Sequence, residues 1–588
     1  MKRLALALEA TRLSRSRIAK EEALAAAFAD LGRDVHDEDG VGLATAVRLA
    51  AGRTLPVGDS RPLGAGYSLM MEIVVLATGF SAGVVSACAR RTGDLGEAFA
   101  LLAARDDRAV ARPGLTLPQV ADLFDALAST GNRLEKRGRL EEAFKRTTPL
   151  EMKYLAKALL GSLRVGAQIG VIEGALARAF EVPIEELRRA AALVTDPGIV
   201  AVLARDGRLD AAHLILGRPV AYMLATPIET IKAEIDPALH VMEDKIDGVR
   251  AQIHKVDGEV RIFARGLEQV TDTFPDVVSG FLTAEGDFAL DGELVALKDD
   301  GRPRPFQALQ VRLRRVSPDP SLVEATPVSF IAYDLLADGE RDLLSVPWRD
   351  RRACLEEFAK ARAPRGRVFL LNPVQAFNAD DASFIEKLDL AFVAARGRGH
   401  EGLVLKRLDS PYEAGRRGQA WIKVKRAFAT LDVVVTAVEE GHGRRAGVLS
   451  DYTFAVWRGE ELVNVGKAYS GLTDLEIEEM TRRLEQLTIE RVGGVHLVRP
   501  EIVLEVAFDG VQPSSRHGSG FALRFPRILR IRQDKAPADA DTIDAVEALF
   551  SSQVETGHRE RGPARKPSKK GKSSAQLSLF GDAVKPKE

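Results

Sequence analysis

Apolar positions recur with a helical period through the first third of the chain. From residue 1 to about 215, alanine and leucine dominate, and steps of four residues link Leu155, Leu159 and Leu163. A breaker such as Asp-Pro-Gly at 196–198 separates the helical segments. No long strand-like alternation is found in this stretch of the sequence. The pattern therefore predicts an all-α domain over residues 1–215.

One uncharged run, residues 73–89, is the candidate for a membrane span. It is shorter than the roughly 20 residues that a spanning helix needs, and Gly79, Ser81 and Gly83 interrupt it. We therefore expect two packed core helices joined by a turn, and no membrane association. The start of the chain is basic and then apolar, but Glu9 ends the apolar run too early for a signal peptide.

After about residue 216 the apolar positions follow the period of strands. Residues 251–254 and 260–263 alternate and flank Asp257-Gly258, which is a strong hairpin signal. Further strands are expected at 288–295, 328–334, 401–406 and 421–425, and a helix at 349–361. Strands with helices between them predict an α+β domain over residues 216–426.

Short strands separated by glycine-rich turns fill the next region, residues 427–540. They are expected at 432–438, 452–457, 462–465 and 502–508. Several short strands in one compact region favour a small β-barrel such as an OB-fold. Beyond it, residues 541–588 are expected to be a disordered basic tail, because lysine and arginine stand there among proline, glycine and serine.

Composition narrows the class of protein. A length of 588 residues implies several domains. The net charge of −1 means that any basic surface must be local rather than general. Cys88 and Cys354 lie far apart, so they suggest neither a zinc cluster nor a disulfide framework, and a cytoplasmic location fits.

The candidate chemistry centres on Lys245, which stands between Glu243 and the turn Asp247-Gly248, with Arg250 just beyond. Asp-Gly is also an ordinary hairpin turn, so this stretch alone favours a solvated surface turn over a reactive site. Lysine is a nucleophile only when it loses its proton, which desolvation and nearby positive charge promote. Arg250, two downstream lysines or a metal ion could supply that charge.

Downstream strands carry further charged residues. Alternation places Trp421, Lys423 and Lys425 on one face, where two lysines repel each other unless an anion such as a polyphosphate lies between them. Glu293 and Glu401 stand at strand positions, where a carboxylate suits a hydroxyl or a hard cation such as Mg²⁺. Each of these residues alone is typical of a solvated surface.

Taken together, these stretches resemble the ATP-dependent DNA ligase family, in its bacterial type with an N-terminal helical DNA-binding domain. The resemblance runs in family order almost to Lys535. The matching motifs are I (Glu243-x-Lys245-x-Asp247-Gly248-x-Arg250), Ia (Phe263-Ala264-Arg265-Gly266), III (Leu290-Asp291-Gly292-Glu293), IIIa (Ala332-Tyr333-Asp334-Leu335-Leu336), IV (Glu401-Gly402-Leu403-Val404-Leu405-Lys406), V (Trp421-Ile422-Lys423-Val424-Lys425) and VI (524–535).

The resemblance implies a multidomain architecture in which the α+β region is the nucleotidyltransferase, or adenylation, domain. It implies that Lys245 attacks the α-phosphate of ATP, carries AMP to a 5′-phosphate, and that a 3′-hydroxyl then displaces the AMP. Such nick sealing serves DNA replication, repair or recombination. The implied cofactors are ATP and Mg²⁺. For the nucleoside, the resemblance implies that Glu243 contacts adenine, Tyr333 stacks on the base and Glu293 contacts the ribose. The other implied roles are phosphate and 5′-end binding (Arg250, Arg265), nucleotide phosphate binding (Arg417, Lys423, Lys425) and metal binding (Glu293, Glu401).

Motif VI would have to move over ATP, with residues 425–432 as the hinge. Two positions depart from the family pattern: Tyr333 replaces a more common phenylalanine, and Tyr222 replaces a proline. Lys406 is left without a role, because on a regular strand it points away from Glu401 and cannot share one phosphate with it.

Nicked duplex DNA is the expected partner of a monomeric enzyme at the bacterial nucleoid. Two arginine–glycine patches, residues 90–96 and 163–170, could bind phosphates at helix ends, although helix packing explains their glycines equally well. In the tail, three bulky apolar residues stand among polar ones, which resembles the peptide that docks proteins on the bacterial sliding clamp. These residues are Gln576, Leu577, Ser578, Leu579 and Phe580. A chance apolar patch is the alternative for so short a motif.

The nearest rival functions are an RNA ligase or an mRNA-capping type of nucleotidyltransferase, which the long helical front domain disfavours. An NAD-dependent ligase lacks support because the cysteines of its usual zinc site are missing. A catalytically silent nick-binding scaffold is a different class, against which the intact Lys245, Glu293, Glu401 and Lys423 speak.

Overall fold

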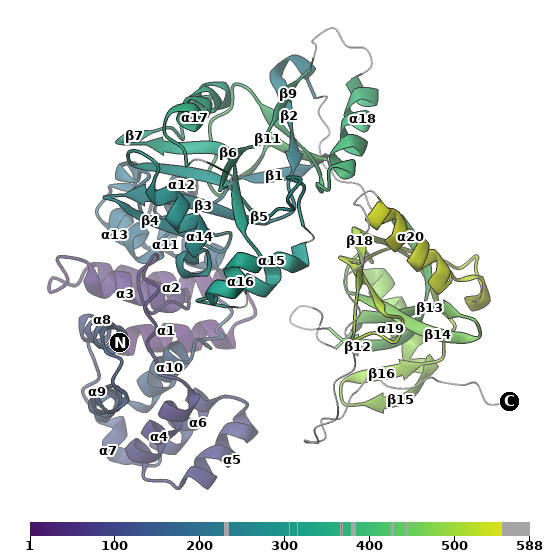
Figure 1. Ribbon diagram of the computed structural model, residues 1–588. Coiled ribbons are helices and arrows are strands. Elements are labelled where there is room, and N and C mark those ends of the chain that lie inside the picture. The colour runs from purple at the N-terminus through teal and green to yellow at the C-terminus, as the bar shows by residue number, and fades with distance from the viewer. Residues whose placement is uncertain are drawn as a thin grey trace. The chain divides into compact units, whose positions relative to one another are not determined.

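The computed structural model (Figure 1) describes residues 1–228, 235–304, 306–313, 315–364, 366, 368–377, 384–424, 429–441, 445 and 447–555. The chain forms two compact units. The first unit holds residues 1–381 and 404–422, and the second holds 382–403 and 423–588.

The first part of the first unit is entirely helical, as the sequence predicts. Its helices are α1 (Lys2–Leu13), α2 (Arg17–Gly32), α3 (Val41–Ala50), α4 (Tyr67–Thr78), α5 (Ala82–Thr92), α6 (Leu95–Ala103), α7 (Asp107–Val110), α8 (Leu117–Ser129), α9 (Arg133–Arg146), α10 (Pro149–Leu159), α11 (Ile169–Ala179), α12 (Ile184–Val194) and α13 (Pro197–Arg205). Capping boxes start two of them, with Thr116 and Gln119 at α8 and Thr148 and Glu151 at α10.

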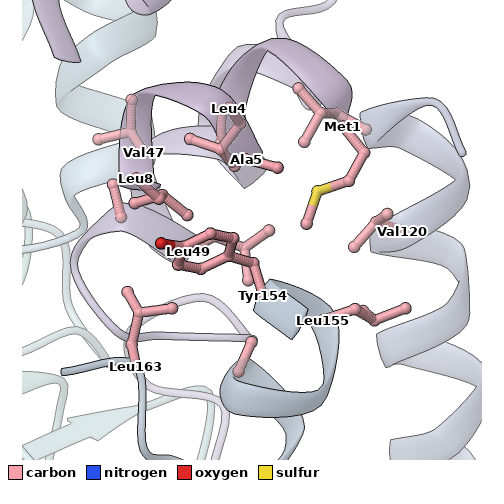
Figure 2. Close-up of a cluster of buried hydrophobic side chains, with 14 of the residues drawn as sticks. Met1, Leu4, Ala5, Leu8, Val47, Leu49, Val120, Tyr154, Leu155 and Leu163 are labelled. Atoms are coloured by element: carbon pink, nitrogen blue, oxygen red, sulfur yellow. The ribbon is translucent and has the colours of Figure 1, made fainter. Parts of the chain in front are cut away.

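One apolar core joins these helices. Figure 2 shows Leu4 and Leu8 of α1 beside Leu49 of α3 and Tyr154 of α10, and all four side chains are buried. Together with Ala5, Ala7 and Thr11, these two α1 leucines form the buried face of the helix, at spacings of three and four residues. Burial of each leucine side chain stabilises the fold by about 1.5–3 kcal/mol.

The uncharged run at 73–89 folds as predicted, into two helices with a turn between them. α4 buries Leu69, Met70, Ile73 and Val74, whereas α5 buries Val85 and Ala89. Among the described residues, no single helix is long and apolar enough to cross a membrane. In the part of the chain that the structure describes, only α4 and α5 together reach that length and composition, and they bend by 113° at their junction.

The rest of the first unit contains two sheets and the helices that cover them. The strands are β1 (Leu224–Pro227), β2 (His240–Lys245), β3 (Val249–Val256), β4 (Glu259–Ala264), β5 (Phe288–Ala296), β6 (Val328–Asp338), β7 (Arg341–Asp342), β8 (Phe369–Leu371), β9 (Val374–Ala376), β10 (Gly402–Arg407) and β11 (Arg417–Val424). The helices are α14 (Pro275–Leu282), α15 (Phe306–Leu313), α16 (Pro320–Ala325) and α17 (Trp348–Ala361).

One sheet has the order β4-β3-β5-β6-β7 with β8 beside β6, and the other has the order β1-β11-β10-β2-β9. The predicted hairpin joins β3 to β4, and both Asp257 and Gly258 have positive φ, as the tight turn requires. A cluster of buried phenylalanines, including Phe281, Phe288 and Phe330, packs against the first sheet. The predicted α+β character is confirmed, although residues 382–403 of the predicted 216–426 domain fall in the second unit.

The second unit is built on a curled sheet with the order β14-β13-β12-β16-β15, in which β17 pairs with β12 and with β20. Its elements are α18 (Phe384–Gly397), β12 (Ala429–Glu440), β13 (Leu449–Arg458), β14 (Glu461–Ala468), α19 (Asp474–Leu487), β15 (Thr488–Val492), β16 (Val495–Val498), β17 (Val503–Phe508), β18 (Gly510–Pro513), β19 (Phe521–Arg524), β20 (Arg527–Ile531) and α20 (Ile543–Glu555). Bulges in β12 bend the sheet. The result is an OB-like domain.

The expected disordered tail from residue 541 is wrong at its start. Residues 543–555 form α20, and its Ile543 and Val546 are buried in the core of the OB-like domain. The apolar spacing of these two residues fits a helix that covers one side of that core. The rest of the predicted tail, including residues 576–580, lies outside the described residues.

Candidate functional site

Lys245 is the last residue of β2, at the edge of a tight turn into β3. Ile246 anchors the turn, because it is buried in a small cluster with Val295 of β5 and Ile331 of β6. Gly248 lies so close to β5 that an added Cβ would stand 2.4 Å from the carbonyl oxygen of Leu294. Only glycine fits this approach.

The electrostatics around Lys245 favour the neutral amine. Its side chain is half-buried, and desolvation lowers the pKa of the amine from its ordinary value. Glu293 and Asp247 oppose this shift, whereas the positive charges of Arg250 and Arg265 add to it. Burial is therefore the main cause of the lowered pKa, because the opposing influence of Glu293 and Asp247 exceeds that of the two arginines.

Glu293 stands opposite Arg250 in the β3–β5 pairing. Burial raises the pKa of Glu293 to about 7, against the opposing influence of Lys245 and Arg250. A further cation near Glu293 would lower this pKa again, because a nearby positive charge favours the ionised form of a carboxyl.

Arg250 is held from several sides. Its guanidinium donates to both carboxylate oxygens of Asp291, at 2.7 and 3.2 Å, and to the carbonyl oxygen of Met223 at 2.6 Å. The rings of Tyr222 and Trp421 lie 4.7 and 5.3 Å from it. Asp291 therefore balances the positive charge of Arg250, and these contacts together fix the position of its guanidinium.

Asp291 has a second donor, the hydroxyl of Tyr412, at 2.8 Å. The sequence motifs assigned a role to neither Asp291 nor Tyr412. The alternation of 288–295 could have pointed to Asp291, since it puts a second buried carboxylate beside Glu293. No local pattern points to Tyr412.

A second buried group surrounds Glu243. One of its carboxylate oxygens, Oε2, accepts from Nζ of Lys406 at 2.9 Å and from the amide of Asn372 at 3.0 Å. The other oxygen, Oε1, is buried and has no hydrogen-bond partner among the described residues. Tyr333 lies beside this group, with its ring 4.7 Å from the ammonium of Lys406. Lys406 thus meets Glu243, a contact that the sequence did not suggest.

The other predicted site residues lie on strands or next to them. Arg265 is exposed just after β4, and Arg417 is exposed at the start of β11. Lys423, near the end of β11, and Glu401, just before β10, are half-buried and belong to the second unit. Lys425 lies outside the described residues. In the described part of the chain, no group of three or more histidine, cysteine or acidic side chains is arranged to hold a metal ion.

The helical region contains an open cleft of about 850 Å³. Residues from the 52–67, 93–95 and 158–164 stretches line it. The first arginine–glycine patch contributes Gly93, Asp94 and Leu95 but not its arginines, and the second contributes Arg164. Arg164 is exposed with a positive φ of 47°, and Arg53, which the sequence analysis missed, also lines the cleft. The N-termini of α4 and α6 border it as well, and helix N-termini favour anions.

The basic residues of motif VI have acidic partners inside the second unit. Arg532 binds Asp432 at 2.9 Å and Asp534 at 2.7 Å, and Lys535 binds Asp432 at 2.7 Å. Asp432 therefore shares its charge between two cations. Any other anion that binds these cations must compete with it.

Three family models match the chain in order. They are described as DNA ligase N terminus (residues 1–177), ATP dependent DNA ligase domain (222–425) and ATP dependent DNA ligase C terminal region (445–535). A protein of Koribacter versatilis named probable DNA ligase is 42% identical over 520 residues, which cover 86% of this chain and 89% of that protein. A DNA ligase of Thermococcus onnurineus is 36% identical, over 86% of this chain and 91% of its own length.

Among solved structures, the one titled Pmar-Lig_PreS3 matches 90% of this chain and 99% of its own, with a TM-score of 0.54 and 18% identity. At that identity the likeness concerns the fold.

Proposed function

Because this chain belongs to the ATP-dependent DNA ligase family, we propose that Lys245 takes up AMP from ATP and passes it to the 5′-phosphate of a nick in duplex DNA. The single observation that carries this proposal is the position of the Lys245 amine. It is half-buried, its pKa is lowered, and two arginines stand near it. An amine without its proton can attack the α-phosphate and expel pyrophosphate.

The buried side chains fit the base of ATP. Oε1 of Glu243 is a buried acceptor without a protein donor, which the amino group of adenine would supply. Tyr333 offers a ring for stacking, and Arg417, Lys423 and Lys425 are the cations that we assign to the phosphates. Phosphates attract such cations strongly.

Mg²⁺ would neutralise phosphate charge in this reaction. Glu293 and Glu401 are the carboxylates that we propose for it, because Mg²⁺ in proteins takes one or two carboxylates besides the substrate phosphates. The raised pKa of Glu293 suits such a role, since a bound cation would return that carboxyl to its ionised form.

In the remaining steps, a 5′-phosphate and a 3′-hydroxyl must both be held at the turn that carries Lys245. Arg265 is exposed just after β4, its charge acts on Lys245, and it is the residue that we assign to the 5′-phosphate. Attack by the 3′-hydroxyl on the DNA-adenylate then releases AMP and forms the phosphodiester bond. A sliding clamp remains a proposed partner through residues 576–580.

Incubation with labelled ATP, GTP or NAD tests this function. We expect ATP to leave a covalent label on the protein, and unlabelled nicked DNA to remove that label as the nick is sealed. Label from GTP alone would favour the capping-type alternative, and label from none of the three would favour a silent scaffold.

DNA binding by the helical cleft gives a separate prediction. The double variant Arg53→Ala, Arg164→Ala should bind nicked duplex about tenfold more weakly, and the salt dependence of its binding should become shallower by about one to two charges. Fluorescence anisotropy at several salt concentrations measures both effects.

The control for this prediction is Arg139→Ala, which removes an exposed arginine of α9 that is paired with Glu135. It should leave DNA affinity unchanged. Labelling by ATP should also be unchanged in the double variant, because that step needs no DNA. Equal losses in the control and the double variant would show that the cleft is not the DNA site.

A further inference from the structure

The two oxygens of the Glu243 carboxylate have unequal surroundings. Oε2 accepts from Lys406 and from Asn372, whose amide also donates to the carbonyl oxygen of Asp244 at 3.0 Å. Oε1 has no donor among the described residues, although the Glu243 side chain is only 2% exposed. A buried carboxylate oxygen without a donor is costly. The arrangement therefore leaves one fixed acceptor for a ligand.

The side chain of Lys406 is also buried and fixed by several contacts. Its side chain is 2% exposed, and its ammonium donates to the carbonyl oxygen of Tyr333 at 3.0 Å. The rings of Trp421, Tyr333 and Trp348 lie 4.5, 4.7 and 5.7 Å from it. Aromatic faces stabilise a cation that has lost its water. The Lys406 ammonium therefore cannot contact a phosphate unless it moves away from these three rings.

Adenine and guanine would interact differently with the Glu243–Lys406 pair. An ionised carboxylate only accepts hydrogen bonds, whereas a protonated one can also donate. Adenine carries an amino donor at the ring position where guanine carries a carbonyl acceptor. An ionised Glu243 thus favours adenine and repels guanine, while a neutral one could bind either base.

We propose that Lys406 is a specificity-determining residue that selects ATP over GTP, by holding Glu243 ionised so that Oε1 can only accept. It acts through Glu243 and is a positioning residue. The inference rests on the proposed function, in which Glu243 meets the base.

The surrounding charges support this assignment. Besides Lys406, the charges that act on Glu243 include those of Arg352 of α17, which lowers its pKa, and Asp334 of β6, which raises it. Asp334 forms a buried ion pair with Arg351 at 2.8 Å. Burial raises the pKa of Glu243, and Lys406 is the strongest influence against that rise. Without Lys406, the carboxyl of Glu243 would hold its proton to a higher pH.

Lysyl-AMP and lysyl-GMP formation, measured with labelled ATP and GTP between pH 6 and 9, tests the proposal. In Lys406→Met, the preference for ATP should fall by about tenfold or more at pH 7, the scale of one lost base contact. The preference should recover as pH rises, because Glu243 regains its charge, whereas that of the unaltered protein should depend less on pH, since Lys406 lowers the pKa of Glu243 there. A merely structural role would not produce this pH dependence.

Lys255→Met is the matched control. Lys255 is also a buried lysine on a strand, but it lies on β3 in the other sheet, and its ammonium donates to the carbonyl oxygens of Leu282 and Ala284. Its replacement should leave the ATP preference unchanged. An unchanged preference in a Lys406→Met protein that melts as a folded domain would overturn the inference.

Glu243→Gln provides a second route if Lys406→Met fails to fold. An amide can turn either its oxygen or its nitrogen toward the base, so the ATP preference should fall at every pH. A preserved preference in this variant would also overturn the inference. Absence of any label in the unaltered protein would instead overturn the proposed function.

Discussion

Lys245→Ala is expected to abolish covalent labelling by ATP, with the rate of the first step falling by more than about 10⁴-fold, as loss of a nucleophile does elsewhere. The reason is chemical: in the proposed function the nitrogen of the half-buried amine bonds to phosphorus, and alanine offers no such atom. In the unaltered protein this rate should fall as pH is lowered, because the protonated amine cannot attack. The lowered pKa of Lys245 shifts that fall to a lower pH than an ordinary lysine would show. Gel autoradiography over a pH series measures both effects.

Lys245→Arg is the control for charge, because arginine keeps a cation beside Glu293 and Asp247 but cannot form the adduct at neutral pH. It should melt like the unaltered protein and take up no label. Both variants should still seal a nick whose 5′-phosphate already carries AMP, since the amine has no further part in that step. Label that persists in Lys245→Ala would place the nucleophile elsewhere.

The local patterns of the sequence were sufficient for the elements that carry the site. The alternation of 288–295 places the apolar side chains of β5 in the core and turns Asp291 and Glu293 toward Arg250. Such patterns have periods of two or 3.6 residues and report only which face is buried. The turn at Lys245 could be placed in this way because it lies between two clear strands.

The partners of the site could not be predicted in the same way, because they come from distant parts of the chain. Asn372 reaches Glu243 across 129 residues and Tyr412 reaches Asp291 across 121. Tertiary packing alone sets such contacts, so no spacing in the sequence reports them. The same holds for Lys406, which strand alternation directs away from Glu401 but not toward any partner.

Asp291→Ala should destabilise the first unit by about 3–5 kcal/mol, because it leaves the guanidinium of Arg250 buried without its counter-charge. The Asp291 side chain has no exposed surface, and that of Arg250 is 15% exposed. Water can therefore replace little of the lost carboxylate. The loss should appear as a lower thermal midpoint, and labelling by ATP should fall as the β3–β5 pairing loosens beside Lys245.

Asp338→Ala is the matched control, since Asp338 lies at the end of β6 and pairs with Arg362 where both side chains are about 30% exposed. Breaking that pair should cost about 1 kcal/mol or less, because water screens it. The double variant Arg250→Met, Asp291→Leu should regain much of the lost stability, since it removes both buried charges together, yet it should not regain labelling. Equal costs for Asp291→Ala and Asp338→Ala would contradict this account. Water would then have to reach Arg250 when its carboxylate partner is removed.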